Sequence, residues 1–204
     1  MVLIKNYYRI KKCRINHGFF TRLNGFSKNN YKSLNCSISN TDNNKLVLKN
    51  RQKALENLNV SKKKLILINQ THSSKVIRIN KYNINKKLYA DGVITSLNDV
   101  VIGVLTADCA PIFLYDNKRK FICSLHSGWK GTLKNICKNA IKLFDKYGVD
   151  RNNLNAIIGP CLGTNYYEVD KKFVKKFLNK DINYSKFFRN KNKNKSFFNL
   201  RGLI

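Results

Sequence analysis

The chain has 204 residues, of which 43% are hydrophobic, so it is long and apolar enough to fold as one domain with a real core. It carries 40 Lys and Arg against 11 Asp and Glu, a formal charge of +29 at pH 7. Only nine of these cations are Arg and the lysines are scattered, so we expect no specific nucleic-acid partner, but an attraction for small anions such as phosphate.

The first third of the chain is polar and rich in loops, with one predicted helix. This helix covers residues 46–58, where Leu48 and Leu55 fall on one face. Asn43 or Asn44 is expected to cap its start, because a short amide side chain can accept a hydrogen bond from the first free N–H groups.

Six short apolar runs follow and predict strands. They are Leu65–Ile68, Val76–Ile79, Gly92–Ile94, Val100–Leu105, Ile112–Tyr115 and Phe121–Leu125. Because continuous apolar runs are typical of strands covered on both faces, we expect residues 64–126 to form an internal sheet.

A long amphipathic helix is predicted over residues 130–147. Ile136, Ala140 and Phe144 belong to an apolar stripe at helical spacing, with lysines opposite. Gly148 is expected to end the helix, because glycine readily adopts the left-handed conformation found just after a helix.

The rest of the chain predicts one more strand, Leu154–Ile158, and an amphipathic helix over 169–178. From Asp181 onward the chain is rich in Lys and Asn and weakly patterned, and no element is predicted. The order of elements predicts an α+β fold with mixed sheets and flanking helices. We expect a single domain over residues 1–204, for which a build from two similar halves stays open.

The cysteine usage favours a reducing compartment. The six cysteines form neither a CxxC pair nor a dense framework: Cys13, Cys36, Cys109, Cys123, Cys137 and Cys161. The opening residues reach Lys5 too soon for a secretory signal, and no apolar run is long enough to span a membrane. We therefore expect a cytoplasmic protein with no membrane partner.

Two histidines and one cysteine follow predicted strands. His72 comes after the run at 65–69, His126 closes Phe121–Leu125, and Cys109 follows Val100–Leu105. Two imidazoles and a thiolate suit Zn²⁺, and three protein ligands leave a fourth position for water or substrate, which is the catalytic pattern. The alternative is two hydrogen-bonded histidines and an inert buried cysteine.

The surroundings of these residues carry a family resemblance. The motifs are, in order, HGFFTR (17–22), NR (50–51), QTH (70–72), ADG (90–92), TADCAP (106–111), HSGWKG (126–131) and IGPCLG (158–163). Over about residues 16–170 they resemble the laccase-domain family, formerly called polyphenol oxidases and now described as purine nucleoside phosphorylases. The most specific part is the combination of ADC with H-x-G-W-K-G.

The resemblance implies a metal and an activity. It implies that His72, Cys109 and His126 bind zinc, the same residues that the strand ends indicate. It also implies phosphorolysis of adenosine, inosine and methylthioadenosine, with a purine nucleoside and phosphate as partners, and deamination of adenosine. Copper is less favoured, because three histidines in the whole chain cannot supply a multicopper cluster.

Three alternatives stay open at this point. Some bacterial relatives are named peptidoglycan editing factors, which implies hydrolysis of misbuilt muramyl-serine precursors. A basic scaffold that binds nucleic acid without catalysis is a second alternative. The third is an inactive copy, because relatives continue well past the Phe198–Leu200 step, whereas this sequence stops at Ile204. We expect a monomer or a homodimer.

Five charged residues accompany the three expected ligands. Asp91 is a candidate general acid or base, or forms a turn with the next glycine. Asp108 is a second catalytic candidate that would orient an imidazole, or caps a turn. Arg22, Arg51 and Lys130 are candidates for substrate binding, with a solvated loop cation for Arg22 and a structural role for Arg51 as alternatives.

Three further motif residues have less direct roles. Trp129 would stack on a base or pack in the core, and the second is the commoner use of such an aromatic residue. Cys161 is expected to be structural, because no spare histidine is available to activate it. His17 is expected to be a positioning residue.

Overall fold

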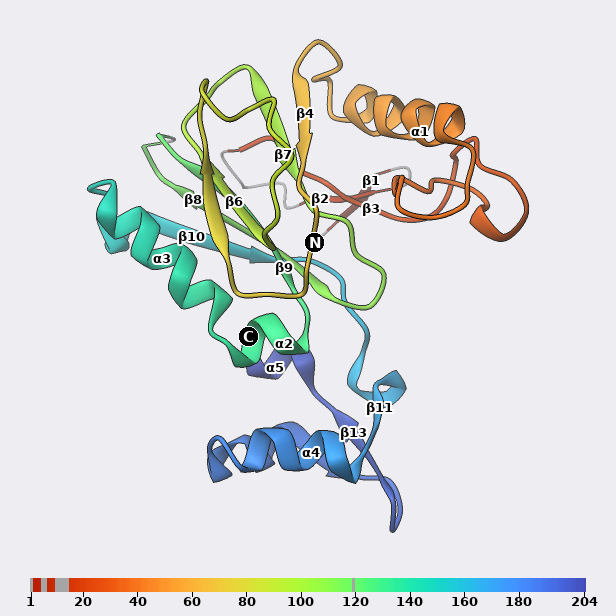
Figure 1. The fold of residues 1–204 in the computed structure, drawn as a ribbon, viewed down its shortest axis with the longest axis vertical. Coiled ribbons are helices and arrows are strands. Elements are labelled where there is room, and N and C mark those ends of the chain that lie inside the picture. Colours follow the sequence, from red (N-terminus) through yellow and green to blue (C-terminus); the bar gives the residue numbers. More distant parts are fainter. Residues whose placement is uncertain (1, 5–6, 10–14, 119) are drawn as a thin grey trace. The chain divides into compact units, whose positions relative to one another are not determined.

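The computed structural model describes residues 2–4, 7–9, 15–118 and 120–204, and the chain divides into two compact units (Figure 1). The first unit is Met1–Leu67 with Leu97–Leu105, and the second is Ile68–Ser96 with Thr106–Ile204. Both contain strands and helices, so the predicted α+β class is confirmed. The expectation of a single domain over 1–204 stays a prediction.

The first unit holds two small sheets and one long helix. Its elements are β1 (Val2–Ile4), β2 (Tyr7–Arg9), β3 (Phe19–Phe20), the 3-10 helix η1 (Asn29–Tyr31), α1 (Asn44–Asn57), β4 (Lys64–Leu67) and β7 (Val100–Gly103). Strands β1, β2 and β3 form an antiparallel sheet in that order, and β4 pairs in parallel with β7. The prediction of one internal sheet over 64–126 is therefore wrong for β4 and β7, because an apolar run indicates a strand but not its partner.

Helix α1 begins as predicted, and its buried face includes the predicted Leu55 but not Leu48. Asn43 caps it, and its side chain accepts a hydrogen bond of 2.9 Å from the Lys45 N–H. The buried positions include Val47 and Asn50, both fully buried, whereas Leu48 is 58% exposed. The predicted face was wrong at Leu48 because the buried face contains a polar residue. The amide of Asn50 is satisfied there by loop residues 26–35, so apolar spacing alone does not reveal that face.

The second unit is built on a five-stranded sheet. Its elements are β5 (Val76–Ile79), β6 (Gly92–Thr95), β8 (Ala110–Asp116), β9 (Ile122–Ser127), α2 (Trp129–Leu133), α3 (Ile136–Lys146), η2 (Arg151–Asn153), β10 (Leu154–Ile158), η3 (Thr164–Tyr166), β11 (Glu168–Asp170), α4 (Lys171–Leu178), η4 (Ile182–Phe187), β12 (Phe188–Asn190), β13 (Lys195–Phe198) and α5 (Leu200–Leu203). The strand order in the main sheet is β10-β8-β9-β6-β5, and only β5 and β6 are parallel.

The core of this unit lies between the sheet and α3 (Figure 1). Ile136, Ala140 and Phe144 of α3 are fully buried and pack against strand residues such as Ile112 and Leu125. The predicted helical stripe and the internal position of β6, β8 and β9 are thereby confirmed. Fully burying one large apolar side chain contributes roughly 1.5–3 kcal/mol, so this stripe stabilises the framework that carries the site.

The predicted helix over 130–147 is broken in two. Helix α2 ends at Leu133 and α3 begins at Ile136, with Asn135 between them in the left-handed region at φ 60°. Asparagine adopts this conformation more readily than most residues, and the apolar spacing does not show the interruption. Gly148 has φ 71° just after α3, as expected for a residue that ends a helix.

The segment after Asp181, for which no element was predicted, is ordered. Strands β11, β13 and β12 form an antiparallel sheet that packs on α4, and Phe177 and Phe198 are fully buried in an aromatic cluster. The Lys/Asn run is the turn between β12 and β13, where the Asn192 side chain accepts hydrogen bonds from the N–H groups of Asn194 and Lys195. The low-complexity run therefore marks a hairpin.

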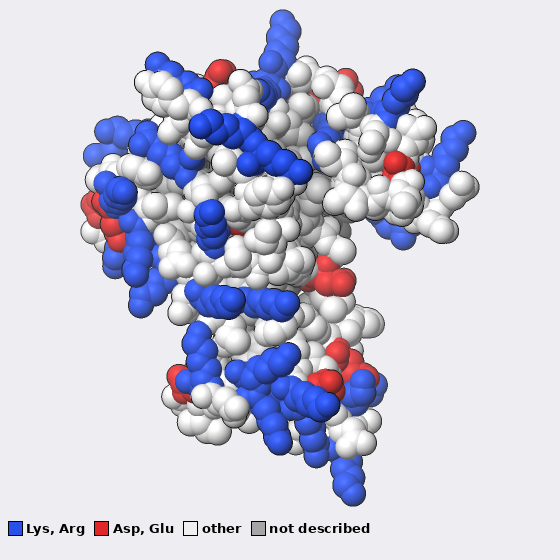
Figure 2. Space-filling view, viewed as in Figure 1, with Lys and Arg blue, Asp and Glu red and all other residues white. Residues whose placement is uncertain are grey.

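The surface is dominated by cations. On the face shown in Figure 2, Lys and Arg side chains are spread widely and do not form one stripe, which agrees with the scatter of lysines along the sequence. Among the described residues, no helix combines the length and the apolar character that a membrane span requires.

Candidate metal centre

Three side chains of the second unit converge at one edge of the main sheet. The donor atoms of His72, Cys109 and His126 all lie within 4.8 Å of one another. The two imidazole rings meet edge to face, with their centroids 4.9 Å apart. Around a tetrahedral zinc ion, nitrogen and sulfur ligands are separated by roughly 3.3–3.6 Å, so small side-chain movements would complete such a site.

Strand register brings Cys109 and His126 together. Strands β8 and β9 are antiparallel, and Pro111 lies opposite His126 while Ala110 lies opposite Ser127. Cys109 comes directly before β8, so it stands beside the end of β9 that carries His126. The sequence placed Cys109 at the end of the preceding strand, whereas the structure places it at the start of the next one.

His72 lies at the same edge of the sheet, but it comes from the loop before the outermost strand, β5. It lies in the loop before β5, which runs parallel to β6, and β6 is the antiparallel neighbour of β9. The starts of β5, β6 and β8 and the end of β9 therefore share one edge. The side chain of Asn139 on α3 donates to the Ser74 carbonyl at 2.9 Å and anchors the loop that carries His72.

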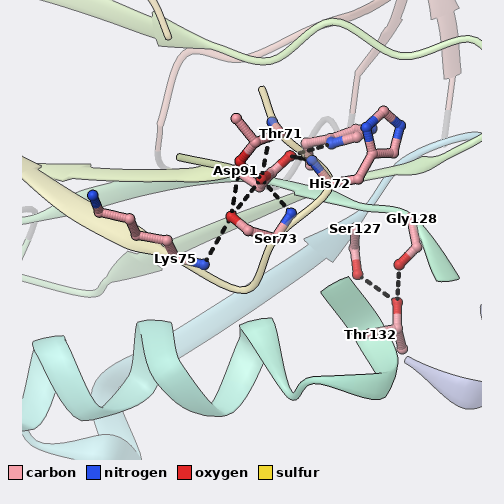
Figure 3. A network of polar contacts seen from close by, with 9 residues as sticks. Thr71, His72, Ser73, Lys75, Asp91, Ser127, Gly128 and Thr132 are labelled. Carbon is pink, nitrogen blue, oxygen red and sulfur yellow. Dashed lines mark hydrogen bonds and ion pairs between the residues drawn. The ribbon is translucent and has the colours of Figure 1, made fainter. Parts of the chain in front are cut away.

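Asp91, just before β6, lies between the two histidines and is fully buried (Figure 3). Its Oδ1 lies 2.8 Å from His126 Nδ1 and accepts a hydrogen bond of 2.9 Å from the His72 backbone N–H. Its Oδ2 accepts from the backbone N–H groups of Thr71 and Ser73, at 3.2 and 2.6 Å, and from both of their hydroxyls. From the sequence, Asp108 was the residue expected to orient an imidazole. In the structure it is Asp91 whose carboxylate contacts the imidazole of His126.

The electrostatics of the centre follow from burial. Burial raises the pKa of Asp91, but hydrogen bonds from His126, Ser73 and Thr71 outweigh it and hold that pKa below its ordinary value. Burial lowers the pKa of His126 in spite of the Asp91 carboxylate, which favours a neutral imidazole with its proton on Nδ1 and a free lone pair on Nε2. Burial, with smaller contributions from Asp108 and Asp91, raises the pKa of the Cys109 thiol, so a metal would displace its proton.

A glycine makes room for the cysteine sulfur. A Cβ atom built on Gly128 would lie 2.8 Å from Cys109 Sγ and 3.6 Å from His72 Cδ2. The hydroxyl of Thr132 holds this turn, since it donates to the Gly128 carbonyl at 2.9 Å and lies 2.7 Å from Ser127 Oγ (Figure 3). No role was predicted for Gly128 or Thr132, although the glycine of the HSGWKG motif was a usable signal.

The other predicted site residues are less closely tied to the three donors. Asp108 is exposed, its carbonyl accepts from the Leu162 N–H at 2.9 Å, and its carboxylate acts electrostatically on Cys109. Lys130 is exposed, with Nζ 5.6 Å from the centroid of the Trp129 ring. It belongs to the five-residue α2 and not to the long helix that was predicted.

The two predicted arginines belong to the first unit. A terminal nitrogen of Arg22 donates to the Lys32 carbonyl at 2.6 Å, and Nε of Arg51 donates to the Cys36 carbonyl at 2.8 Å. Both contacts hold loops of that unit, and the role of the arginines in substrate binding stays a prediction.

The remaining motif residues have structural surroundings. Trp129 is half-buried and packs edge-on against Phe173, with centroids 4.9 Å apart, in the aromatic cluster of α4. Burial raises the pKa of Cys161, which agrees with an unreactive thiol. The buried His17 has Nδ1 3.1 Å from the Ile15 carbonyl oxygen, and its expected positioning role stays a prediction. Cys13 lies outside the described residues, and the other five cysteines are free thiols.

Comparisons with known proteins show which family the chain matches. The family described as "Multi-copper polyphenol oxidoreductase laccase" matches residues 16–204. The chain is 37% identical over 126 residues to "Purine nucleoside phosphorylase RP494" of Rickettsia prowazekii (strain Madrid E), covering 62% of this chain and 51% of that protein. It is 30% identical over 164 residues to "Purine nucleoside phosphorylase YlmD" of Bacillus subtilis (strain 168), covering 76% of this chain and 59% of that protein.

Two further comparisons concern activity and fold. The chain is 30% identical over 164 residues to "Adenosine deaminase RL5" of an unknown prokaryotic organism, covering 76% of this chain and 63% of that protein. The crystal structure of Bacillus licheniformis hypothetical protein YfiH superimposes with a TM-score of 0.83 at 26% identity, covering 91% of this chain and 73% of that one. The chain spans about half the length of the first two curated relatives it matches, both from Rickettsia, at 51% and 50%.

Proposed function

The chain belongs to the family described as multi-copper polyphenol oxidoreductase laccase, and on that premise we propose that it is a zinc-dependent purine nucleoside phosphorylase that also deaminates adenosine. The observation that carries the proposal is the convergence of the His72, Cys109 and His126 donor atoms within 4.8 Å. Relatives named purine nucleoside phosphorylase and adenosine deaminase support the substrate class and both reactions. Adenosine, inosine and methylthioadenosine are the proposed substrates.

The donor set fits zinc better than copper. Two imidazole nitrogens and one thiolate are borderline-soft ligands, and a three-residue set leaves one position for a further ligand. A multicopper centre needs several histidines, whereas the chain has three and one of them, His17, belongs to the first unit. When bound, zinc supplies Lewis acidity, which stabilises negative charge on the reacting groups.

The residues of the chain supply positioning and proton transfer. In phosphorolysis a phosphate oxygen bonds to C1′ of the ribose, the bond from C1′ to the base breaks, and the base takes up a proton. Asp108 is the proposed general acid, which in its protonated form would give the base this proton, because its carboxyl group is exposed beside Cys109. Lys130 is the proposed phosphate contact, and substrate binding by Arg22 and by Arg51 remains a proposal from their residue type.

Metal content and turnover should be measured together. The purified protein, loaded with zinc, should release free base from inosine, adenosine and methylthioadenosine in the presence of phosphate. His72→Ala and Cys109→Ala should each lose bound zinc and lower turnover at least ~100-fold, since removing one ligand leaves too few donors. Cys161→Ala is the matched control, because this thiol lies outside the three-donor set and should keep both properties.

Three other outcomes of these measurements would contradict the proposed function. Wild-type turnover in both ligand variants would remove zinc from the mechanism. Tight zinc binding without turnover of any nucleoside would refute the phosphorylase proposal and favour an inactive copy. Release of serine-linked products from a muramyl precursor, with no free base, would favour peptidoglycan editing. A cytoplasmic monomer or homodimer stays a prediction.

A further inference from the structure

We propose that Asp91 is a positioning residue that joins the two histidines of the metal centre into one unit by placing its carboxylate in an anion-binding turn. The proposal rests on the metal site of the proposed function and adds to it the residue that assembles that site. It also replaces the acid or base role that the sequence suggested for Asp91. Figure 3 shows the contacts of Asp91 with Thr71, His72 and Ser73.

The turn that carries His72 is built around the Asp91 carboxylate. His72 has φ 55°, in the left-handed region that residues with a side chain rarely adopt. The backbone N–H groups of Thr71, His72 and Ser73 all point at the Asp91 carboxylate, at 3.2, 2.9 and 2.6 Å. Successive N–H groups that surround an anion in this way form a nest. The negative charge of Asp91 therefore stabilises a turn that would otherwise be disfavoured, and the turn aims His72 at the site.

The Asp91 carboxylate also contacts the second histidine, His126. The same oxygen that accepts from the His72 N–H, Oδ1, lies 2.8 Å from His126 Nδ1. The backbone carbonyl of Asp91 also accepts from the His126 N–H, at 2.7 Å. A carboxylate on Nδ1 fixes the proton there and leaves Nε2 as the ligand atom, which is how outer carboxylates orient metal-binding histidines. Oδ1 of Asp91 therefore holds the backbone of His72 in place and sets the tautomer of His126.

The same contacts argue against proton transfer by Asp91. Its two oxygens have six contacts with donor groups of Thr71, His72, Ser73 and His126, and the residue is fully buried. A general acid or base must reach the substrate within hydrogen-bond distance, directly or through one water. The Asp91 carboxylate is surrounded by the protein's own donors, so it acts through the histidines.

The test is metal affinity with chemical rescue. Asp91→Ala empties the nest and should weaken zinc binding by about 10–100-fold, the usual effect of removing an outer carboxylate. Formate or acetate should restore part of that affinity, because the nest would accept a small carboxylate. Asp91→Asn keeps the size but turns an amide towards N–H donors, so it should lose affinity and should not respond to formate. Zinc affinity is measured by competition with a chelator, and folding by circular dichroism.

Asp116→Ala is the matched control. Asp116 is also buried, and it also accepts backbone hydrogen bonds in a turn, from Lys120 and Phe121 at 3.3 and 2.7 Å. Within the part of the chain that the structure describes, its carboxylate accepts from Lys120 and Phe121 and not from His72, Cys109 or His126, so its loss should lower stability without changing the zinc affinity of the folded protein. Formate should have no effect on this variant.

The outcomes separate this proposal from the proposed function. Wild-type zinc affinity in folded Asp91→Ala would overturn the positioning role. If that variant does not fold, the same result in Asp91→Asn would overturn it. Unchanged zinc affinity with lost turnover in Asp91→Asn would also overturn it, and would restore the acid or base role. If the His72→Ala variant kept its bound zinc, the proposed function would be refuted instead.

Discussion

Replacing Gly128 by alanine would place a methyl group against the sulfur proposed to bind the metal. The backbone of Gly128, at φ −80° and ψ 173°, is open to alanine, so any effect comes from space and not from backbone strain. The new Cβ would lie 2.8 Å from Cys109 Sγ. Ordinary contacts between such atoms are roughly 3.5–4.0 Å, so the sulfur or the turn must move by about 1 Å.

A movement of that size is incompatible with coordination. Metal–ligand distances tolerate only about ±0.2 Å, so the thiolate would leave the bonding range. We expect zinc affinity to fall at least ~100-fold, which is about 2.7 kcal/mol, since each factor of ten is worth about 1.4 kcal/mol. Overpacking should also lower the free energy of unfolding by about 1–3 kcal/mol.

Chelator competition measures the zinc affinity, and the absorbance of thiolate-bound cobalt reports on the Cys109 bond. Gly163→Ala is the control, because its Cβ would meet only Tyr166 Cδ2 at an ordinary 3.7 Å and its φ is −70°. A folded Gly128→Ala variant that binds zinc as tightly as the parent, with unchanged cobalt absorbance, would show that the Cys109 sulfur is not a ligand at this position.

Two further predictions concern the framework that carries the site. Asn135→Ala should lower the free energy of unfolding in urea by about 1–2 kcal/mol, because alanine tolerates the φ of 60° between α2 and α3 poorly, whereas Asn135→Gly should be neutral or stabilising. Equal stability of the two variants would contradict the left-handed break. Phe177→Ala should lower it by about 3–5 kcal/mol, because this side chain is fully buried among aromatic rings, and the half-buried Phe197→Ala should cost clearly less.

The residue types of the site could be predicted from the sequence because they are a chemical property of single positions. Two histidines and a cysteine form a zinc-binding set wherever they meet, and the motifs around His72, Cys109 and His126 point to one family. The strands Val76–Ile79 and Leu154–Ile158 were also predictable to the residue, since their apolar runs are local. The helix cap was predicted as Asn43 or Asn44 for the same reason, and the structure places it at Asn43.

The features that were missed depend on partners far away in the chain. Apolar spacing predicts a helix or a strand, but it does not show which segment packs against it. It therefore did not show that β4 pairs with β7, that Leu48 is exposed, or that the segment after Asp181 folds onto α4. The break at Asn135 was missed because it leaves the apolar stripe intact on either side.

The sequence alone determined which donor atoms are available and which fold class delivers them. Only the tertiary structure decided how they meet, because the register of β8 on β9 and of β6 on β9 sets the neighbours at the sheet edge. That register gives Asp91 its place between His72 and His126, and leaves room for the Cys109 sulfur over Gly128. The apolar pattern of a strand sets which of its faces is buried, but it does not name the distant strand that lies beside it.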